Sequence, residues 1–528
     1  MAEGEEKKSF LYKLKPVTDR LPAVTKPEGH VHFRTKMSWI ILILVLYFAM
    51  TNVVIYGLDS GQGVDLFAQY RAILAGAQFS LMHLGIGPIV TGSIIMQLFT
   101  GAKIIKLDLK NADDKAIYQG TQKLLVIVMI VVESVPQVYG FMEPSGKFID
   151  MSESLWAGGG LSIARSFIVV QLVAGSYLVF LMDEVVSKWG IGSGISLFIA
   201  AGVSQQIFTG SLNWHPASPG DALSLANPPA GTIPKTIYIF HHMSAPELSN
   251  GGYEQIFLAQ PNPMVALIGT IVIFLFVAYT ESSRIELPLA HGGARGARGR
   301  YPIKLIYASN IPVILMAALL ANVSMFSMLF ASHPSFMNMP LLGSNWMLGY
   351  YAEGNTVAAG GLAYYLSMVN GVGDWLLPLL SGDYLNSYNA GIGDVKTRIQ
   401  IGIHVIVYVT VMIFGSILFA KFWIETTNMG PEAVASQIES SGMQIPGFRR
   451  DPRVLKRVLE RYIPVVTVIS GAVVGGLAAG ADLIGTVGNA SGTGVLLAVG
   501  IMIQLYDAIG REQMMEMHPV LRGFFGGE

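Results

Sequence analysis

The sequence predicts an all-α polytopic membrane protein with ten transmembrane helices. Of its 528 residues, 52% are hydrophobic and only 13% are charged, a composition that soluble domains of this size do not usually have. Ten stretches reach the length of about 20 mostly apolar residues that a membrane span requires. They are residues 38 to 57, 83 to 102, 122 to 142, 163 to 183, 191 to 209, 262 to 280, 303 to 330, 401 to 424, 463 to 484 and 492 to 510.

The distribution of basic residues predicts how these spans are oriented. The leader, the even-numbered connections and the tail contain 28 of the 34 lysines and arginines, including those at the edges of the spans. Cytoplasmic segments carry this excess in membrane proteins, so we expect both termini in the cytoplasm. Residues 1 to 37 then form a cytoplasmic leader, in which the amphipathic stretch SFLYKLKPVTDRLP lies along the membrane surface. Residues 511 to 528 form a cytoplasmic tail.

The first outer connection contains a segment that is too short to cross the membrane. DLFAQYRAILAGAQFSL, from Asp65 to Leu81, has helical spacing and only two charged residues, and the second span follows it closely. This favours a short re-entrant helix, which is tolerated at membrane depth only inside protein or beside a water-filled cavity. Such a segment would act as a stopper.

The second span begins with residues that are poorly suited to a helix. Its sequence HLGIGPIVTGS places Ile86 and Val90 one helical turn apart, and WGIGSGISLF repeats this spacing with Ile191 and Ile195. Aliphatic pairs at this spacing usually indicate ordinary packing. The glycines indicate places where backbones approach closely, as does the small-residue stretch SGAVVGGLAAG in the ninth span.

Few residues offer chemistry inside the membrane. The chain has no cysteine, which excludes disulfides, thiolate catalysis and zinc-thiolate sites, and it contains no common hydrolase, nucleotide-binding or calcium-binding motif. Glu133 is the clearest acid within a span, while Asp183, Glu184, Asp482 and Asp507 lie near span ends. Proton-coupled transporters and selective cation channels usually need more charge at mid-membrane. His404 lies on an apolar face and is expected to be a hydrogen-bonded core residue.

Two cytoplasmic loops are strongly basic, and two outer loops are unusually long. The basic loops span residues 281 to 304 and 425 to 461. They either act only as topology determinants that contact lipid headgroups or form a docking surface for a polyanion such as ribosomal RNA. The outer loops span residues 210 to 261 and 331 to 399. Their length indicates a function, but the sequence assigns none.

Five motifs resemble the SecY family of protein-conducting channels in its archaeal form. They are GIGPIVTGSIIMQL, KWGIGSGISLFIAAGVSQ, YPIKLIYASNIPVIL, RYIP and GTGVLLAV, and the resemblance runs in order over nearly the whole chain. It implies two pseudo-symmetric, inverted halves of five spans, residues 38 to 209 and 262 to 510, with a re-entrant plug helix at about residues 65 to 80. It also implies a central pore that passes secretory polypeptides across the membrane and releases hydrophobic segments sideways into lipid.

The resemblance assigns roles to particular residues. A pore ring would be formed by Ile86, Val90, Ile191, Ile195, Ile311, Ile314 and Leu497. The plug would include Asp65, Leu66, Phe67, Arg71, Ile73 and Leu74, and the lateral gate a polar cluster of Thr91, Glu133 and Asn322. Ribosome docking would use Arg284, Arg295, Arg298, Arg300, Arg449 and Arg450 in the two basic loops.

The resemblance also implies partners and the absence of enzymatic activity. We expect a heterotrimer with a SecE-type gamma subunit and a Sec beta subunit in the cell membrane. Further partners would be the ribosome with its nascent chain, signal peptides, lipid and, as an additional docking factor, the signal recognition particle receptor. Neither a cofactor nor a small-molecule substrate is expected. Two alternatives remain open from the sequence: a secondary transporter with inverted repeats, and a membrane scaffold without an open pore.

Overall fold

Nearly all of the described chain is helical. The computed structural model describes residues 10–59, 70–102, 104–105, 107, 109, 111–155, 158–218, 221–291, 298–304, 306, 308, 310–332, 339, 344–352, 355, 357–427, 429–440, 443–444, 452–488 and 490–517. Within these residues, nine helices are long and apolar enough to cross a membrane. The chain is therefore a multi-pass membrane protein.

The first half of the chain contains five long helices. They are α2 (Phe33–Asn52), α3 (Gly87–Gly101), α4 (Ala112–Phe141), α6 (Gly160–Trp189) and α7 (Gly194–Leu212). The leader adds η1 (Phe10–Leu14) and α1 (Lys15–Thr18), and α5 (Gly146–Leu155) lies between α4 and α6. With 15 residues, α3 is shorter than a complete span. The count of ten transmembrane helices therefore stays a prediction.

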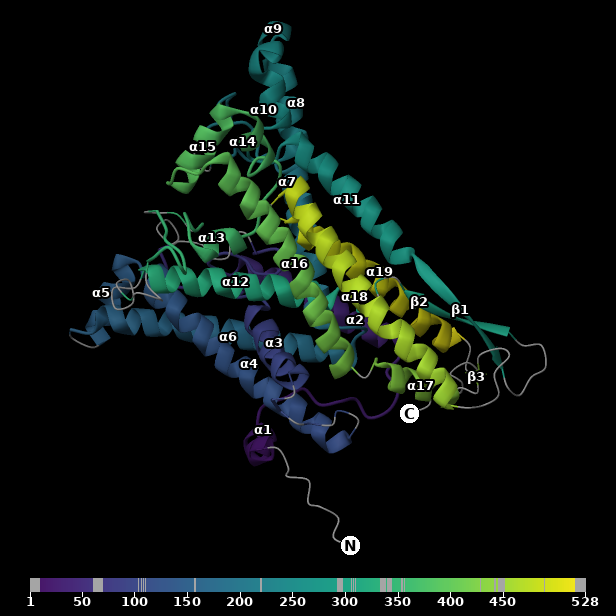
Figure 1. Cartoon of the computed structure of the whole chain (residues 1–528). Coiled ribbons are helices and arrows are strands. Elements are labelled where there is room, and N and C mark those ends of the chain that lie inside the picture. The colour runs from purple at the N-terminus through teal and green to yellow at the C-terminus, as the bar shows by residue number, and fades with distance from the viewer. Residues whose placement is uncertain are drawn as a thin grey trace.

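The second half contains another five long helices. They are α11 (Met264–Ser282), α12 (Ile311–Ser332), α16 (Arg398–Thr426), α18 (Pro452–Ile484) and α19 (Gly492–Met517). The outer loops fold into short helices: α8 (Thr232–His242), α9 (Ala245–Glu247), η2 (Leu248–Gly252), α10 (Tyr253–Phe257), α13 (Leu362–Leu366), α14 (Leu376–Leu380) and α15 (Gly382–Ile392). Figure 1 shows α8 to α10, α14 and α15 on one side of the molecule, and α1, α17 (Pro431–Ser440) and the strands on the other.

A small antiparallel sheet departs from the all-helical prediction. Strand β1 (Arg284–His291) lies between β2 (Arg298–Lys304) and β3 (Met443–Gln444). In the register, Arg284 is opposite Lys304, while Ala290 pairs with Gln444 of the other basic loop. The two basic loops, which are far apart in the sequence, are thus joined by backbone pairing.

Close helix packing depends on small residues, as predicted for the ninth span. A Cβ atom added to Gly471 would lie 2.8 Å from Ile417 Cα, and one added to Gly475 would lie 2.6 Å from Met412 O. These two glycines let α18 approach α16 closely. The outward faces of the helices remain apolar, because Leu275 is 63% and Phe414 68% exposed in the isolated chain, as expected for residues that face lipid.

Candidate functional site

The seven predicted ring residues lie at the beginnings of four helices and share one hydrophobic core. Ile86, Val90, Ile191, Ile314 and Leu497 are all buried, and Ile195 and Ile311 pack against the same cluster. They come from α3, α7, α12 and α19, each within or just before the first two turns. The shared core therefore brings the beginnings of these four helices together.

The start of α3 is bonded to the described part of the plug segment. Gly85 has a φ of +55°, and a Cβ atom there would lie 2.0 Å from the carbonyl oxygen of Leu74. Only glycine fits this approach. The next amide, that of Ile86, donates a hydrogen bond to the same Leu74 carbonyl oxygen at 2.8 Å. The poor helix formers at the beginning of the predicted second span thus form a turn, and α3 begins four residues later than predicted.

The described part of the plug segment, residues 70 to 80, forms turns and not the predicted regular helix. Ile73 and Leu74 are buried, and buried Arg71 donates to the carbonyl oxygen of His83. A cavity of about 350 Å³ lies between this segment, α2 and α7, with Arg71 and Tyr47 among its lining residues. The predicted plug residues Asp65, Leu66 and Phe67 lie outside the described residues.

The three predicted gate residues form a chain of hydrogen bonds across three helices. Asn322 Nδ2 in α12 donates to Thr91 Oγ1 in α3 at 2.8 Å, and Thr91 Oγ1 lies 2.9 Å from Glu133 Oε1 in α4. Thr91 Oγ1 also lies 2.9 Å from the carbonyl oxygen of Gly87. Glu133 is 1% exposed. The structure therefore brings these residues together as a buried polar contact between the two halves.

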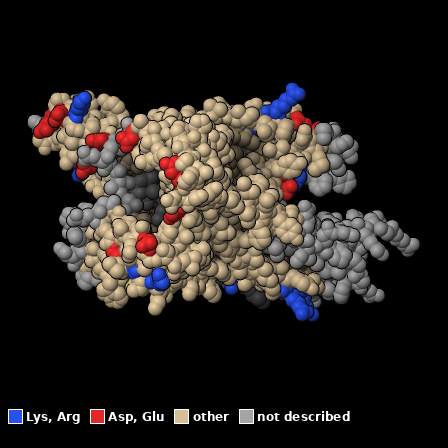
Figure 2. Space-filling model, turned by 90° about the horizontal axis from the view of Figure 1, so that it is seen from above, with Lys and Arg blue, Asp and Glu red and all other residues tan. Residues whose placement is uncertain are grey.

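The predicted docking arginines are described only in part. Arg284, Arg298 and Arg300 lie in the strands β1 and β2, while Arg295, Arg449 and Arg450 lie outside the described residues. The sheet nevertheless places the two basic loops side by side. Among the described residues on the face seen in Figure 2, the charged side chains lie in small, separate groups.

The leader is bonded to the C-terminal end of α6, a contact that the sequence did not reveal. Glu184 Oε2 accepts the amide hydrogen of Val24 at 2.8 Å and pairs with Lys188 at 3.3 Å, while Glu184 Oε1 forms an ion pair with Lys123. Lys188 Nζ in turn donates to the carbonyl oxygen of Val24 at 2.5 Å. The amphipathic leader thus lies on protein over this part of its length.

The second outer loop contains an aromatic cluster around a buried lysine. Lys396 Nζ lies 4.9 Å from the centre of the Tyr364 ring and 5.7 Å from that of Tyr350, and it pairs with Asp394 at 2.7 Å. Burial alone would lower the pKa of Lys396, but the hydrogen bond to Asp394 raises it above its ordinary value. His404 in α16, the predicted core histidine, is buried with its Nε2 3.0 Å from the Ser367 carbonyl oxygen, which confirms that prediction.

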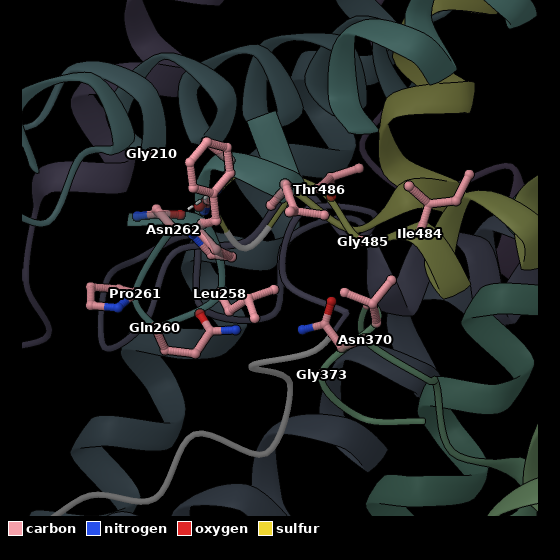
Figure 3. Close-up of a pocket in the computed structure, with 18 of the residues that line it drawn as sticks. Gly210, Leu258, Gln260, Pro261, Asn262, Asn370, Gly373, Ile484, Gly485 and Thr486 are labelled. Carbon is pink, nitrogen blue, oxygen red and sulfur yellow. Dashed lines mark hydrogen bonds between the residues drawn. The ribbon is translucent and has the colours of Figure 1, made fainter. Parts of the chain in front are cut away.

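An uncharged cavity of about 280 Å³ lies at the junction between the two halves. It is lined by the end of α7, the residues before α11, the loop before α14 and the connection from α18 to α19. In Figure 3 the side-chain amides of Gln260 and Asn370 point toward one another across it. Asn262 closes one side by accepting from the Gly488 amide at 2.7 Å. No sequence motif pointed to this cavity, because its walls come from four distant segments.

Comparisons with known proteins agree with this arrangement. The SecY family model matches residues 80–506, and that of the plug domain of Sec61p matches residues 45–78. The protein translocase subunit SecY of Haloferax volcanii is 45% identical, covering 97% of this chain and 98% of its own length. That of Archaeoglobus fulgidus is 44% identical, with 98% and 99% covered.

Solved structures agree as well. One described as the structure of a protein conducting channel has a TM-score of 0.71 at 36% identity, covering 96% of this chain and 98% of its own. Sec61 in the canine ribosome-channel complex from the endoplasmic reticulum has a TM-score of 0.69, with the same identity and coverage. The secondary-transporter alternative is therefore set aside. The chain belongs to the SecY family and is the pore-forming subunit of a protein-translocation channel.

Proposed function

We propose that polypeptides cross this channel through a waist formed by the seven aliphatic ring residues at the starts of α3, α7, α12 and α19. The single observation that carries this proposal is that these residues, more than 400 positions apart at the extremes, lie in one buried core. A channel for arbitrary sequences cannot hydrogen-bond its cargo strongly without trapping some of it. An apolar constriction also loses water easily and so resists ion flow.

The plug, at about residues 65 to 80, closes the waist from the outer side in this proposal. Its support is the backbone hydrogen bond between Leu74 and Ile86, which ties the plug segment to a ring residue. The chain of Asn322, Thr91 and Glu133 forms the lateral gate, because it is a polar link between helices of opposite halves. A signal peptide that gains more by contacting lipid than these bonds provide would open the gate.

The two basic loops dock the ribosome in this proposal. Their support is the pairing of β1 with β3, which makes them one surface, and the similarity to a Sec61 channel solved in a ribosome-channel complex. The channel works in the cell membrane with both termini in the cytoplasm and assembles with a SecE-type gamma and a Sec beta subunit. Translation or an external motor supplies the driving force, and the signal recognition particle receptor delivers the ribosome.

A crosslinking experiment tests passage through the waist. The chain has no native cysteine, so one cysteine replacing Ile191 is unique. A second cysteine is placed at successive positions of a secretory chain stalled on a ribosome. After oxidation, we expect a disulfide-linked adduct whose yield depends on the position of the cysteine in the stalled chain, because only a few positions lie at the waist for a given chain length.

The matched control replaces Phe208, an exposed residue of α7, the helix that begins just after Ile191, by cysteine. It should give little adduct at any position. An equal yield from both sites, or no adduct from Ile191→Cys in membranes where translocation proceeds, would contradict passage through this ring.

A further inference from the structure

The first turn of α7 is capped by an acid from the preceding span. Asp183 Oδ1 in α6 accepts the amide hydrogen of Ile195 at 2.9 Å. A Cβ atom added to Gly194 would lie 2.8 Å from the same oxygen and 2.5 Å from Asp183 Cα. The residue at the ordinary cap position, Ser193, makes no side-chain capping bond. The helix that carries the ring residue Ile195 is thus held at its start by Asp183.

The first turn of α19 is capped in the same way. Asp482 Oδ1 in α18 accepts the amide hydrogen of Thr493 at 2.8 Å, and its Oδ2 accepts from Thr493 Oγ1 at 2.5 Å. Tyr408 in α16 donates to Oδ2 at 2.7 Å. Gly492 allows the close approach, since a Cβ atom there would lie 2.0 Å from the Ala481 carbonyl carbon. Asp482 is 1% exposed.

The two contacts correspond to each other in the two halves. In each half the acid lies on the fourth long helix and caps the fifth, and in each the capped helix begins with Ser-Gly, at Ser193 and Ser491. One cap lies at the cytoplasmic side and the other at the outer side, as inverted halves require. Because the intervening sequences differ, WGIGSG and TVGNASG, the repeated geometry points to a shared role for the two acids.

The other two ring helices also begin beside buried acids. Glu133 reaches α3 through Thr91, as described above, and Glu281 Oε1 of α11 accepts from Asn310 Nδ2 just before α12 at 2.9 Å. Asp183 and Asp482 differ from these two acids because each accepts a hydrogen bond directly from a first-turn amide of a ring helix. The first amides of a helix have no partner within the helix, and water is scarce in an apolar waist. A carboxylate is the group that satisfies them best.

We infer that Asp183 and Asp482 are positioning residues that hold the ring side chains of α7 and α19 in the closed arrangement. This inference rests on the proposed ring. According to this inference, the tightness of the closed ring depends on two residues that are not themselves ring residues. If either capping bond is weakened, the N-terminus of the capped helix can shift. The ring residue on that helix then no longer packs against the other ring residues.

The test uses the purified channel with its partner subunits in lipid vesicles. D183N and D482N keep the side-chain shape but remove the negative charge. We expect each to raise the resting ion leak about fivefold, because a neutral amide accepts more weakly from the first-turn amides than a carboxylate and loses the attraction to the helix dipole. We also expect a broader distance distribution between spin labels on cysteines replacing the exposed residues Phe208 in α7 and Tyr506 in α19. Melting temperatures are compared, because a purely structural defect would lower these without opening the seal.

Two control variants separate the caps from their neighbours. E184Q removes the adjacent acid, which bonds the leader and not α7, and Y408F removes the third partner of Asp482 but keeps its bonds to Thr493. Both should leave the leak and the label distances unchanged. If Y408F leaks as much as D482N, Asp482 acts through α16 and the inference for α19 is overturned. If D482N yields no folded protein, D183N decides alone.

A ring variant distinguishes failure of this inference from failure of the proposed function. I191S places a hydroxyl in the ring itself and should raise the leak. If I191S does not raise the leak, the ring proposal fails. If I191S raises the leak while D183N and D482N change neither leak nor label distances, the ring stands and the positioning role of the two acids is refuted.

Discussion

At the scale of single residues, the outer loops are held by a few buried polar groups with specific partners. Lys235 in α8 donates to the carbonyl oxygens of Ala259 at 2.6 Å and Pro261 at 3.1 Å, beside the uncharged cavity. Burial lowers the pKa of Lys235 to about 8. Asp374 in the second outer loop accepts the amide hydrogen of Asn370 at 3.0 Å, and burial raises its pKa to about 6. Such groups make the outer face sensitive to pH.

The shift of Asp374 predicts that the second outer loop tightens on mild acidification. Because the pKa is higher in the folded state than the ordinary value of 3.8, the folded loop binds a proton more readily than the unfolded loop. Its stabilising effect is complete below about pH 4 and is lost as the pH rises through about 6. Hydrogen exchange of residues 370 to 381, corrected for intrinsic rates, should therefore slow between pH 7 and pH 5.

D374N should remove this dependence, since an amide cannot take up the proton. D383N, which changes an exposed acid in α15, is the matched control and should retain it. A pH dependence that persists in D374N would assign the effect to another group.

At the scale of elements, local patterns predicted the long helices well and non-local contacts poorly. The apolar stretches identified the cores of the spanning helices, but α4 and α18 begin about ten residues earlier than predicted, at Ala112 and Pro452. Asn111 caps α4 by accepting the Asp113 amide hydrogen, a signal that a search for apolar residues alone overlooks. The pairing of Ala290 with Gln444 joins segments that no local pattern connects. The gate cluster was found only because the family motifs surround it.

The gate helices offer a prediction about membrane insertion. Replacing Glu133 and Asn322 together by leucine removes buried polar groups from the contact between α3, α4 and α12. The closed gate then gains apolar packing between these helices. The lost interhelical hydrogen bonds contribute on average only about 0.6 kcal/mol each, so their loss destabilises the closed gate less than the new packing stabilises it. We expect the hydrophobicity required for a segment to enter the membrane to rise, measured with a graded series of test segments.

Ser134 provides the control for the gate variant. It lies next to Glu133 but bonds only to the Ile130 carbonyl oxygen of its own helix. S134A should leave the threshold unchanged. If the double leucine variant requires the same segment hydrophobicity for membrane entry as the original protein, the cluster does not act as the gate.

At the scale of the whole molecule, the two halves meet in one core, while the leader helix α1 and the strands of the two basic loops lie on one side (Figure 1). The large hydrophobic cluster includes residues from α2 to α19, so the halves are not independent bodies. The basic loops both leave from the second half, and the leader is attached to the first through Glu184. A ribosome bound to the basic loops would thus contact the second half directly and affect the first half through the shared core.

Charge reversal of Arg449 and Arg450 to glutamate tests this docking surface. We expect weaker co-sedimentation with ribosomes and a smaller dependence on salt, because fewer phosphate contacts release fewer counterions. The control reverses Lys13 and Lys15, two exposed leader residues, and changes the net charge by the same amount. If both double variants bind ribosomes equally well across a salt series, docking does not use these arginines.

The hydrogen bond from the Ile86 amide to the Leu74 carbonyl oxygen has a consequence for how the channel recloses. If the plug segment leaves during translocation, as the proposed mechanism requires, this amide loses its partner in a place where water is scarce, and an unsatisfied buried amide costs about 1 to 3 kcal/mol. A translocating chain can satisfy it only briefly, since each passing carbonyl moves on. In the empty open pore, the Ile86 amide therefore lacks a lasting acceptor other than the Leu74 carbonyl oxygen. Re-forming this hydrogen bond favours the return of the plug segment to its closed position.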